Sequence, residues 1–269
     1  MEKIPLPNKI EYKEVKKNQT QITIEPLFPG YGITIANPLR RVLLSSLTGA
    51  AITKIKIKGI KHEFSSLPYL KEDIVDFILN VKKIRIKMFQ DEPIVLTLKT
   101  KGEKELTAGD ISKNAQAEVV NPELVLGHLT DKSAEIEIDF TVERGKGYVT
   151  VEEKPNEDLA VDEISIDSLF TPIVNVSFNI EAVRVGKITN YEKLVMKVET
   201  DGTVTPKEAF SNASKILIDH LSLLHGEDYN LELEEEEKAE EIIEEKPVKE
   251  KKEKKEKSVK EKKEKKSKK

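Results

Sequence analysis

The 269-residue chain has no cysteine and no tryptophan, and aromatic residues make up only 5% of it. Without cysteine, disulfides and thiolate metal sites are excluded. So few aromatics argue against a protein that stacks single-stranded bases on its side chains. No apolar run approaches the roughly 18 residues needed to span a bilayer, and the first residues lack the apolar core of a signal peptide. Together these absences predict a cytoplasmic protein.

Charge, by contrast, is abundant and unevenly placed. Charged residues make up 35% of the chain, which is too polar for one compact globule. Residues 227–245 hold eleven acids and one lysine, and residues 246–269 hold fourteen lysines and five glutamates. Such a segment cannot bury enough surface to offset its ordering entropy. We therefore expect a disordered tail over 228–269, whose lysine block is suited to non-specific contact with DNA.

Three helices are predicted in the remaining body. The first covers 34–47, although Asn37-Pro38 also suits a cap and first helical position, and Gly49 suits a left-handed C-terminal residue. The second covers 71–82, and the third begins at a capping box, Thr205 to Glu208, and runs to 224. The first and third helices carry apolar faces that need partners, either within the chain or in a second copy.

Strand patterns fill much of the rest of the body. Alternating or continuous apolar runs predict strands over 20–24, 51–57, 84–88, 94–98, 119–126, 134–142, 173–185 and 193–200. A tight basic turn is expected at 144–148 and a polar loop over 152–162. The mixture of both periodicities predicts an α+β fold.

Groupings of residues that point to catalysis are scarce. No two histidines have the His-x-x-x-His spacing of a zinc site. Gly30-Tyr31-Gly32 precedes a helix as a phosphate loop does, but it lacks the Gly-Lys-Ser/Thr ending and the third glycine of a dinucleotide fingerprint. Carboxylate pairs such as Asp73 with Asp76, or Asp162 with Asp167, occur by chance in so acidic a chain. We therefore favour an assembly protein over an unrecognised hydrolase or a stand-alone nucleic-acid-binding protein.

One long stretch carries a resemblance to a known family. Residues 23–49, TIEPLFPGYGITIANPLRRVLLSSLTG, resemble the signature of the bacterial DNA-directed RNA polymerase α subunits. The likeness continues in order through 60–65, 72–74, 79–82, 129–131, 144–148, 170–172, 179–185, 193–195 and 199–203. It covers nearly all of residues 10–226.

The resemblance implies an architecture. Residues 1–48 and 170–227 are expected to form a dimerisation domain, with a mostly β domain, 49–169, inserted into it. The long helices are expected to pack against their copies in a second chain. The expected dimer-interface residues are Leu39, Val42, Leu43, Leu47, Phe210, Ala213, Leu217, Leu221 and Leu224.

The resemblance also implies a role in transcription. Such a chain homodimerises and scaffolds the β and β′ subunits of a nucleotidyltransferase, without a catalytic residue or cofactor of its own; magnesium is expected in the catalytic partner subunits. Arg40, Arg41 and Leu44 match positions that contact β, since arginine forms bidentate bonds to carboxylates and carbonyls. Lys82 and Ile166 match positions implicated in the β′ contact. Arg184 lies in a stretch that also faces the large subunits.

Two departures from the family pattern affect these expectations. Ala36 stands where the family usually has glycine, and Pro38 where a small residue other than proline is usual, so the start of the first helix is open by one turn. Residues 227–269 also lack the apolar periodicity of the family's small C-terminal DNA-binding domain, so we expect that domain to be absent.

Overall fold

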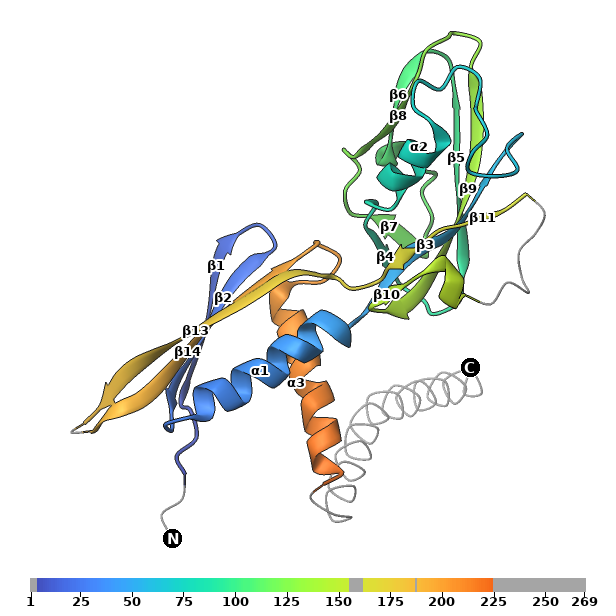
Figure 1. The fold of residues 1–269 in the computed structure, drawn as a ribbon. Helices are drawn as coiled ribbons and strands as arrows, with labels where there is room; N and C mark the ends of the chain where they lie inside the picture. Colours follow the sequence, from blue (N-terminus) through green and yellow to red (C-terminus); the bar gives the residue numbers. More distant parts are fainter. Residues whose placement is uncertain (1–3, 155–161, 187, 225–269) are drawn as a thin grey trace, which may run out of the picture. The chain divides into compact units, whose positions relative to one another are not determined.

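The computed structural model describes residues 4–154, 162–186 and 188–224 (Figure 1). Within these residues the fold is mixed α+β, with three α-helices among many strands, which confirms the predicted fold class. Met1–Leu217 form one compact unit; of the second unit, Ile218–Lys269, the description reaches residue 224. The predicted tail over 228–269 and most of the expected 152–162 loop lie outside the described residues.

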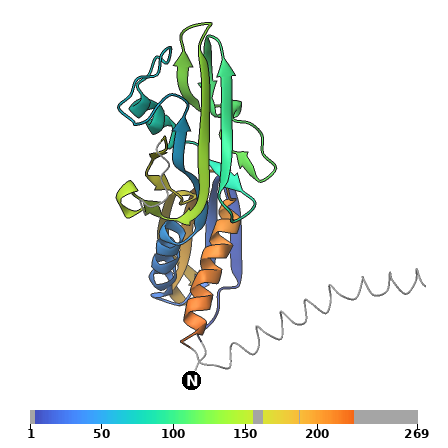
Figure 2. The same ribbon diagram turned by 90° about the vertical axis from the view of Figure 1, so that its right-hand side faces the viewer.

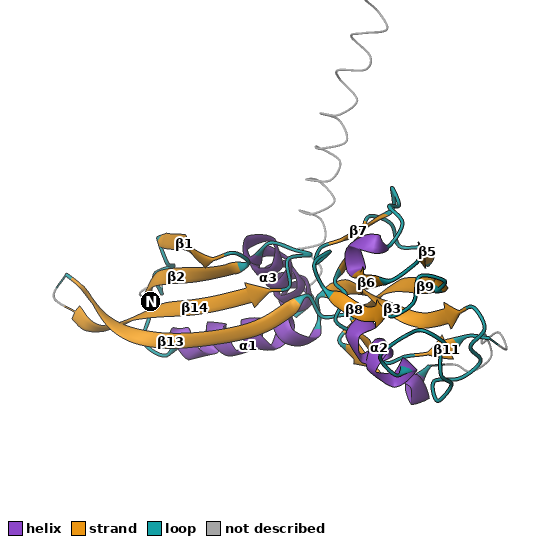
Figure 3. Ribbon diagram, turned by 90° about the horizontal axis from the view of Figure 1, so that it is seen from above, coloured by secondary structure: helices purple, strands orange, loops and turns teal. Residues whose placement is uncertain are grey.

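One antiparallel sheet is built from the two ends of the body. Its strand order is β1-β2-β14-β13, and its members are β1 (Lys9–Lys16), β2 (Gln19–Leu27), β13 (Ile173–Val185) and β14 (Ile188–Thr200). Helix α1 (Tyr31–Ser45) lies along β13 and β14 (Figure 3). Helix α3 (Pro206–Ser222) begins after β14 and packs Phe210 edge-on against Tyr12 of β1.

A hydrophobic core joins these elements. Leu39 and Leu43 recur at helical spacing on α1 and are buried together with Leu194 and Met196 from β14. The two periodicities therefore bring one face of the helix against one face of the sheet. Every core residue of this cluster comes from 22–47 or from 173–213.

A second sheet has the order β11-β3-β9-β5. Its strands are β3 (Thr48–Ile57), β5 (Ile94–Lys101), β9 (Glu135–Lys146) and β11 (Ile164–Ser165). Figure 2 shows the long strands β9 and β5 side by side, as their eight paired residues require. Helix α2 (Ile74–Val81) packs into the same core through Ile74, Phe77, Ile78 and Val81.

Short strands and 3₁₀ turns surround the second sheet. Three two-stranded sheets pair β4 (Ile86–Met88) with β7 (Ala117–Val119), β6 (Lys104–Thr107) with β8 (Val125–Leu129), and β10 (Tyr148–Val149) with β12 (Ser168–Leu169). The 3₁₀ turns are η1 (Ala108–Asp110) and η2 (Val151–Glu153). The buried core residues here all lie between 52 and 166, separate from the first cluster. The domain boundaries at 48/49 and 169/170 themselves stay predictions.

Several local predictions hold and several are wrong. The Thr205–Glu208 capping box forms, since the Thr205 N–H donates to Glu208 Oε2 over 3.0 Å and the Glu208 N–H donates to Thr205 Oγ1 over 3.2 Å. The strand predicted over 119–126 is wrong, because a turn at 120–124 separates β7 from β8. Gly49 is not a helix cap; it lies in β3, where any Cβ would meet the Phe170 carbonyl oxygen at 1.8 Å.

The start of α1 differs from both sequence-based alternatives. The helix begins at Tyr31, with Gly30 at φ 86° before it, and Pro38 lies inside it. Asn37 is therefore not the cap. The left-handed conformation at Gly30, which only glycine adopts without cost, turns the chain out of β2 into the helix a full turn earlier than periodicity indicated. None of the helices in the described part of the chain is long and apolar enough to cross a membrane.

Candidate functional site

The Gly30-Tyr31-Gly32 turn holds an anion, and that anion belongs to the chain itself. Glu192, on β14, accepts hydrogen bonds from the Gly30 N–H and the Gly32 N–H, both over 2.8 Å. Helix N-termini attract negative charge because their first N–H groups are unpaired and the helix dipole is positive there. A Cβ at Gly32 would lie 2.7 Å from Glu192 Oε2, so a larger residue there would displace the carboxylate from its present position. This turn is therefore an internal cap rather than a phosphate-binding loop.

The outer face of α1 presents two arginines. Arg40, Arg41 and Leu44 are exposed, while Leu39 and Leu43 on the opposite face are buried. Within the part of the chain that the structure describes, neither guanidinium has an ion-pair partner. The sequence-based expectation that these three residues face outward agrees with their exposure. Two free, planar donor groups one residue apart suit an acceptor-rich protein surface.

Lys82, just beyond the end of α2, is placed differently. Its ammonium donates to Asp167 Oδ2 over 2.8 Å, and both side chains are about 30% exposed. Asp167 also accepts a hydrogen bond from the Val151 N–H over 3.0 Å. The hydrogen bond from Lys82, and then that from Val151, hold the pKa of the Asp167 carboxyl below its usual range. Lys82 is thus a paired cation in a small polar network.

Ile166 does not share this surface. Its side chain is 3% exposed and belongs to the core below the β3 sheet, and its N–H donates to the Thr53 carbonyl over 3.0 Å. Its own carbonyl accepts hydrogen bonds from Lys154 Nζ and Ser168 Oγ. Because it is buried, the side chain cannot itself touch a partner; the exposed groups beside Lys82 are those of Asp167 and Tyr148. Sequence reasoning missed both, although Tyr148 ends the RGKGY stretch.

Arg184 is exposed near the end of β13. Its Nε donates to the Gly186 carbonyl over 2.9 Å, which closes the turn toward β14. The guanidinium keeps its remaining donors free for another acceptor. Among the described residues, no ion pair involves Arg184, Arg40 or Arg41, and Lys82 is paired with Asp167.

The predicted dimer-interface residues fall into two groups. Buried in the single chain's own core are Leu39, Leu43, Leu47, Phe210 and Ala213. Val42 and Leu217 are partly buried against that core, while Leu221 and Leu224 are 61% and 82% exposed. The first group therefore has partners within the single chain, and the assignment of these residues to a dimer interface stays a prediction.

The features that motivated a hydrolase hypothesis gain nothing from the structure. Among the described residues, no three His, Asp or Glu side chains form a group that could hold a metal ion. His128 is joined to Glu72, with Nδ1 2.6 Å from Oε1. Every described carboxyl group with a resolved pKa shift has its pKa lowered: Glu72, Asp110, Asp131, Glu137, Asp167 and Glu208. A general acid needs the opposite shift.

Comparison with known proteins agrees with this reading. Residues 55–171 match the family model described as the RNA polymerase Rpb3/RpoA insert domain. The DNA-directed RNA polymerase subunit alpha of Moorella thermoacetica is 45% identical over 218 residues, which cover 81% of this chain and 69% of that protein. The same subunit of Carboxydothermus hydrogenoformans is 41% identical over 247 residues, covering 90% and 79%. That of Symbiobacterium thermophilum is 46% identical over 226 residues, covering 84% and 70%.

Proposed function

Because the chain belongs to the family of DNA-directed RNA polymerase α subunits, we propose that it homodimerises and scaffolds assembly of the β and β′ subunits. It is a non-catalytic subunit of a nucleotidyltransferase, and it associates with the other subunits of that enzyme. The catalytic residues and the magnesium ions are assigned to the partner subunits, and no cofactor to this chain. The observation that carries the proposal is the exposure of Arg40 and Arg41 on α1, where neither has an ion-pair partner among the described residues, opposite a buried face that packs against the sheet.

Arg40, Arg41 and Leu44 are assigned to the β subunit. The burial of Leu39 and Leu43 fixes the rotation of α1, so the two guanidinium groups project from a rigid surface. The planar guanidinium is pre-organised, so less entropy is lost per hydrogen bond that it forms, and arginine is prominent among the residues that dominate interface energetics. Leu44 adds apolar area next to them.

Lys82, with Asp167 beside it, is assigned to the β′ subunit. The pair arrives already formed, so its desolvation costs less than that of a single charge. Arg184 is assigned to the large subunits without a choice between them. Homodimerisation is assigned to the apolar residues that the chain leaves exposed, Leu221 and Leu224, together with the half-buried Val42 and Leu217.

Co-expression with the β and β′ subunits of the same organism tests this function. The Arg41→Ala chain should stay dimeric and lose β, with binding weakened about 30-fold or more, as for a dominant interface arginine. Lys13→Ala, which removes an exposed cation from β1, is the matched control and should assemble normally. A native chain that stays monomeric at micromolar concentration, or that captures neither large subunit, contradicts the proposal.

Non-specific DNA contact by the lysine block, 246–269, remains a separate proposal and lies outside the described residues. It rests on fourteen lysines in that segment. Deletion of the segment should flatten the salt dependence of upstream DNA binding by the holoenzyme, because fewer counterions are released. An unchanged slope rejects it.

A further inference from the structure

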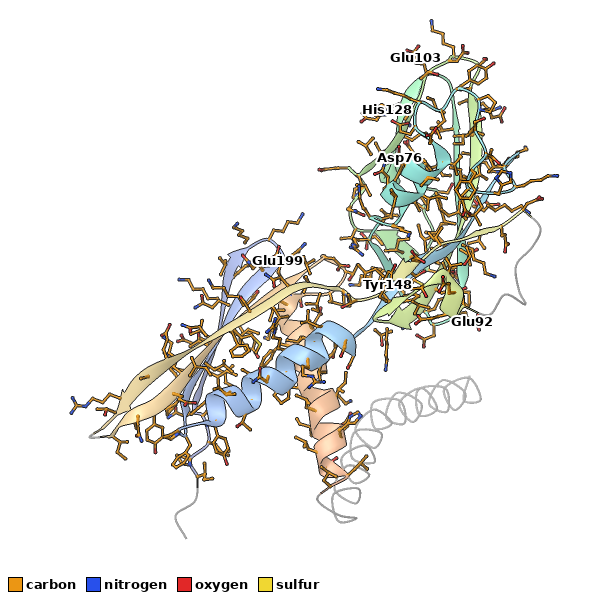
Figure 4. The ribbon with its side chains drawn as sticks, in the orientation of Figure 1. Asp76, Glu92, Glu103, His128, Tyr148 and Glu199 are labelled. Atoms are coloured by element: carbon orange, nitrogen blue, oxygen red, sulfur yellow. The ribbon has the colours of Figure 1, made fainter. Side chains whose placement is uncertain are left out.

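We propose that the turn after β14 and the β4–β7 pair form a brace that fixes the core around β3 against the sheet of β13 and β14. The brace consists of Arg85, Val120, Asp201 and Gly202, which belong to one compact unit of the chain. Glu199, labelled in Figure 4, marks the end of β14, where the turn begins. The inference concerns the single chain and does not depend on its proposed role in assembly.

The chain passes between its two hydrophobic cores twice, and the two crossings lie side by side. One crossing leads from α1 into β3, and the other leads from β12 into β13. A Cβ at Gly49, in the first crossing, would lie 1.8 Å from the carbonyl oxygen of Phe170, in the second. The Thr171 hydroxyl donates to the Leu44 carbonyl over 3.4 Å. Two adjacent crossings make one hinge, and cores joined by little contact move relative to each other unless a further contact restrains them.

Arg85 supplies the ionic half of this restraint. Its Nε lies 3.9 Å from Asp201 Oδ2, and the two side chains are only 25% and 8% exposed. The Arg85 N–H donates to Asn121 Oδ1 over 2.8 Å, and its carbonyl accepts from the Val120 N–H over 2.8 Å. On the other side, Asp201 Oδ1 accepts from the Thr203 N–H over 2.9 Å and from its hydroxyl over 2.6 Å. Each charge is therefore held by its own segment, and the pair is screened less by salt than a surface pair.

Gly202 supplies the packing half. Its φ of 96° is a conformation that glycine adopts without steric cost. A Cβ there would lie 3.0 Å from Val120 Cγ1 and 2.7 Å from Asn18 Nδ2. The Asn18 carbonyl also accepts from the Thr200 N–H over 2.9 Å. The backbone of the turn therefore fits between the β1–β2 turn of one core and a side chain of the other core.

The charges on the two sides of the brace are complementary. Arg85 and Lys87 are two residues apart with a buried residue between them, so strand alternation places both on the outer side of β4. Opposite them lie Asp201 and, at the start of α3, Glu208. The hydrogen bonds from Thr205 lower the pKa of the Glu208 carboxyl most, and the charge of Lys87 lowers it further. A basic strand edge thus faces an acidic turn and helix start.

The absence of cysteine from the chain allows the orientation of the two cores to be measured directly. Lys13→Cys, on β1, and Glu103→Cys, in the turn after β5 and labelled in Figure 4, place one nitroxide label on each core at an exposed site. Labelled full-length chain is mixed with an excess of unlabelled chain, so that the distances arise within one chain. Double electron–electron resonance should give one narrow distance distribution for the chain with the native brace.

The ionic half is tested by reversing one charge. Arg85→Glu should broaden the distance distribution and shift its mean, because it sets like charges together beside Asp201. Arg85→Lys keeps the cation and should keep most of the native width. Lys113→Glu, at an exposed lysine of the same core, is the matched control and should change nothing. Equal widths for Arg85→Glu and Lys113→Glu overturn the brace, and so does a broad distribution in the chain with the native brace.

The packing half is tested without a change of charge. Gly202→Ala adds a methyl group between Val120 and Asn18, whereas Gly59→Ala adds one at a similar φ of 88° with no atom within 4 Å. Both substitutions strain the backbone, but only Gly202→Ala should broaden the distribution. Native circular dichroism in each variant shows that both cores are folded, so the width then reports their orientation alone. Equal widths for the two glycine variants contradict the packing contact and with it the brace.

Discussion

The two proposed contact surfaces present their positive charges in opposite ways. On α1, Arg40 and Arg41 project from the helix without an ion-pair partner among the described residues, and the buried face of the helix packs against the sheet. Beyond α2, Lys82 is paired with Asp167, which also accepts a hydrogen bond from the Val151 N–H. The difference teaches that a positive charge by itself does not reveal its role: an arginine without an ion-pair partner among the described residues can bind an acceptor on another protein, whereas the Lys82 ammonium already has Asp167 as its partner.

The α1 surface should depend most on core packing. Leu43 is 0% exposed and Leu44 is 37% exposed, although the two are adjacent. Leu43→Ala should lower the free energy of unfolding by about 2–5 kcal/mol, because it removes buried atoms and leaves a cavity. Leu44→Ala should lower it by less than about 0.5 kcal/mol. Urea unfolding of both variants measures the contrast. If both variants lose the same free energy of unfolding, the buried face is not what holds α1 against the sheet.

Glu192 provides a smaller, polar contribution to the same surface. Glu192→Gln keeps one acceptor but removes the charge that faces two N–H groups at the start of α1. We expect a loss of about 1 kcal/mol in the free energy of unfolding, typical of a lost cap and helix-dipole interaction. Glu181→Gln is a suitable control, because Glu181 makes an exposed ion pair with Lys193. If both variants lose the same stability, the capping role of Glu192 is wrong.

The Lys82–Asp167 pair should show the smallest effect on stability and a characteristic pH dependence. Asp167→Asn should cost less than about 1 kcal/mol at neutral pH, since the Lys82 pair is partly exposed. The folded-state pKa of Asp167 is lowered, so its stabilisation is present above the unfolded pKa of about 3.9 and is lost as pH falls through the folded-state pKa. Urea titrations should therefore show a difference in the free energy of unfolding between the native and Asp167→Asn chains at pH 7. In strong acid the two chains should unfold alike. A pH-independent difference contradicts the ion pair.

Local sequence patterns were sufficient to predict some helices and strands and insufficient to predict others. The capping box at Thr205 and the apolar spacing on α2 involve residues within one or two turns, so the sequence alone predicts both. The outward direction of Arg40 and Arg41 also follows from helical spacing. The helix start at Tyr31 could not be predicted, because Glu192 stabilises it from a strand 160 residues further along the chain.

The candidate site likewise has features that the sequence predicted and features that depend on tertiary contacts. The resemblance identified Lys82, but the ion pair to Asp167 and the burial of Ile166 depend on how β3, β10 and β12 come together. Likewise, Leu39 and Phe210 are apolar residues at helical spacing, and spacing cannot tell a core within one chain from an interface between two chains.

The sequence by itself determined the family, the α+β class, the helix with its capping box and the arginines on the outer side of α1. Those properties depend on residue identity and on contacts between near neighbours. Only the tertiary structure decided which leucines are buried within the chain, why the Gly30–Gly32 turn is occupied, and which groups surround Lys82. Each of these depends on side chains that are far apart in sequence and become neighbours only when the sheets form.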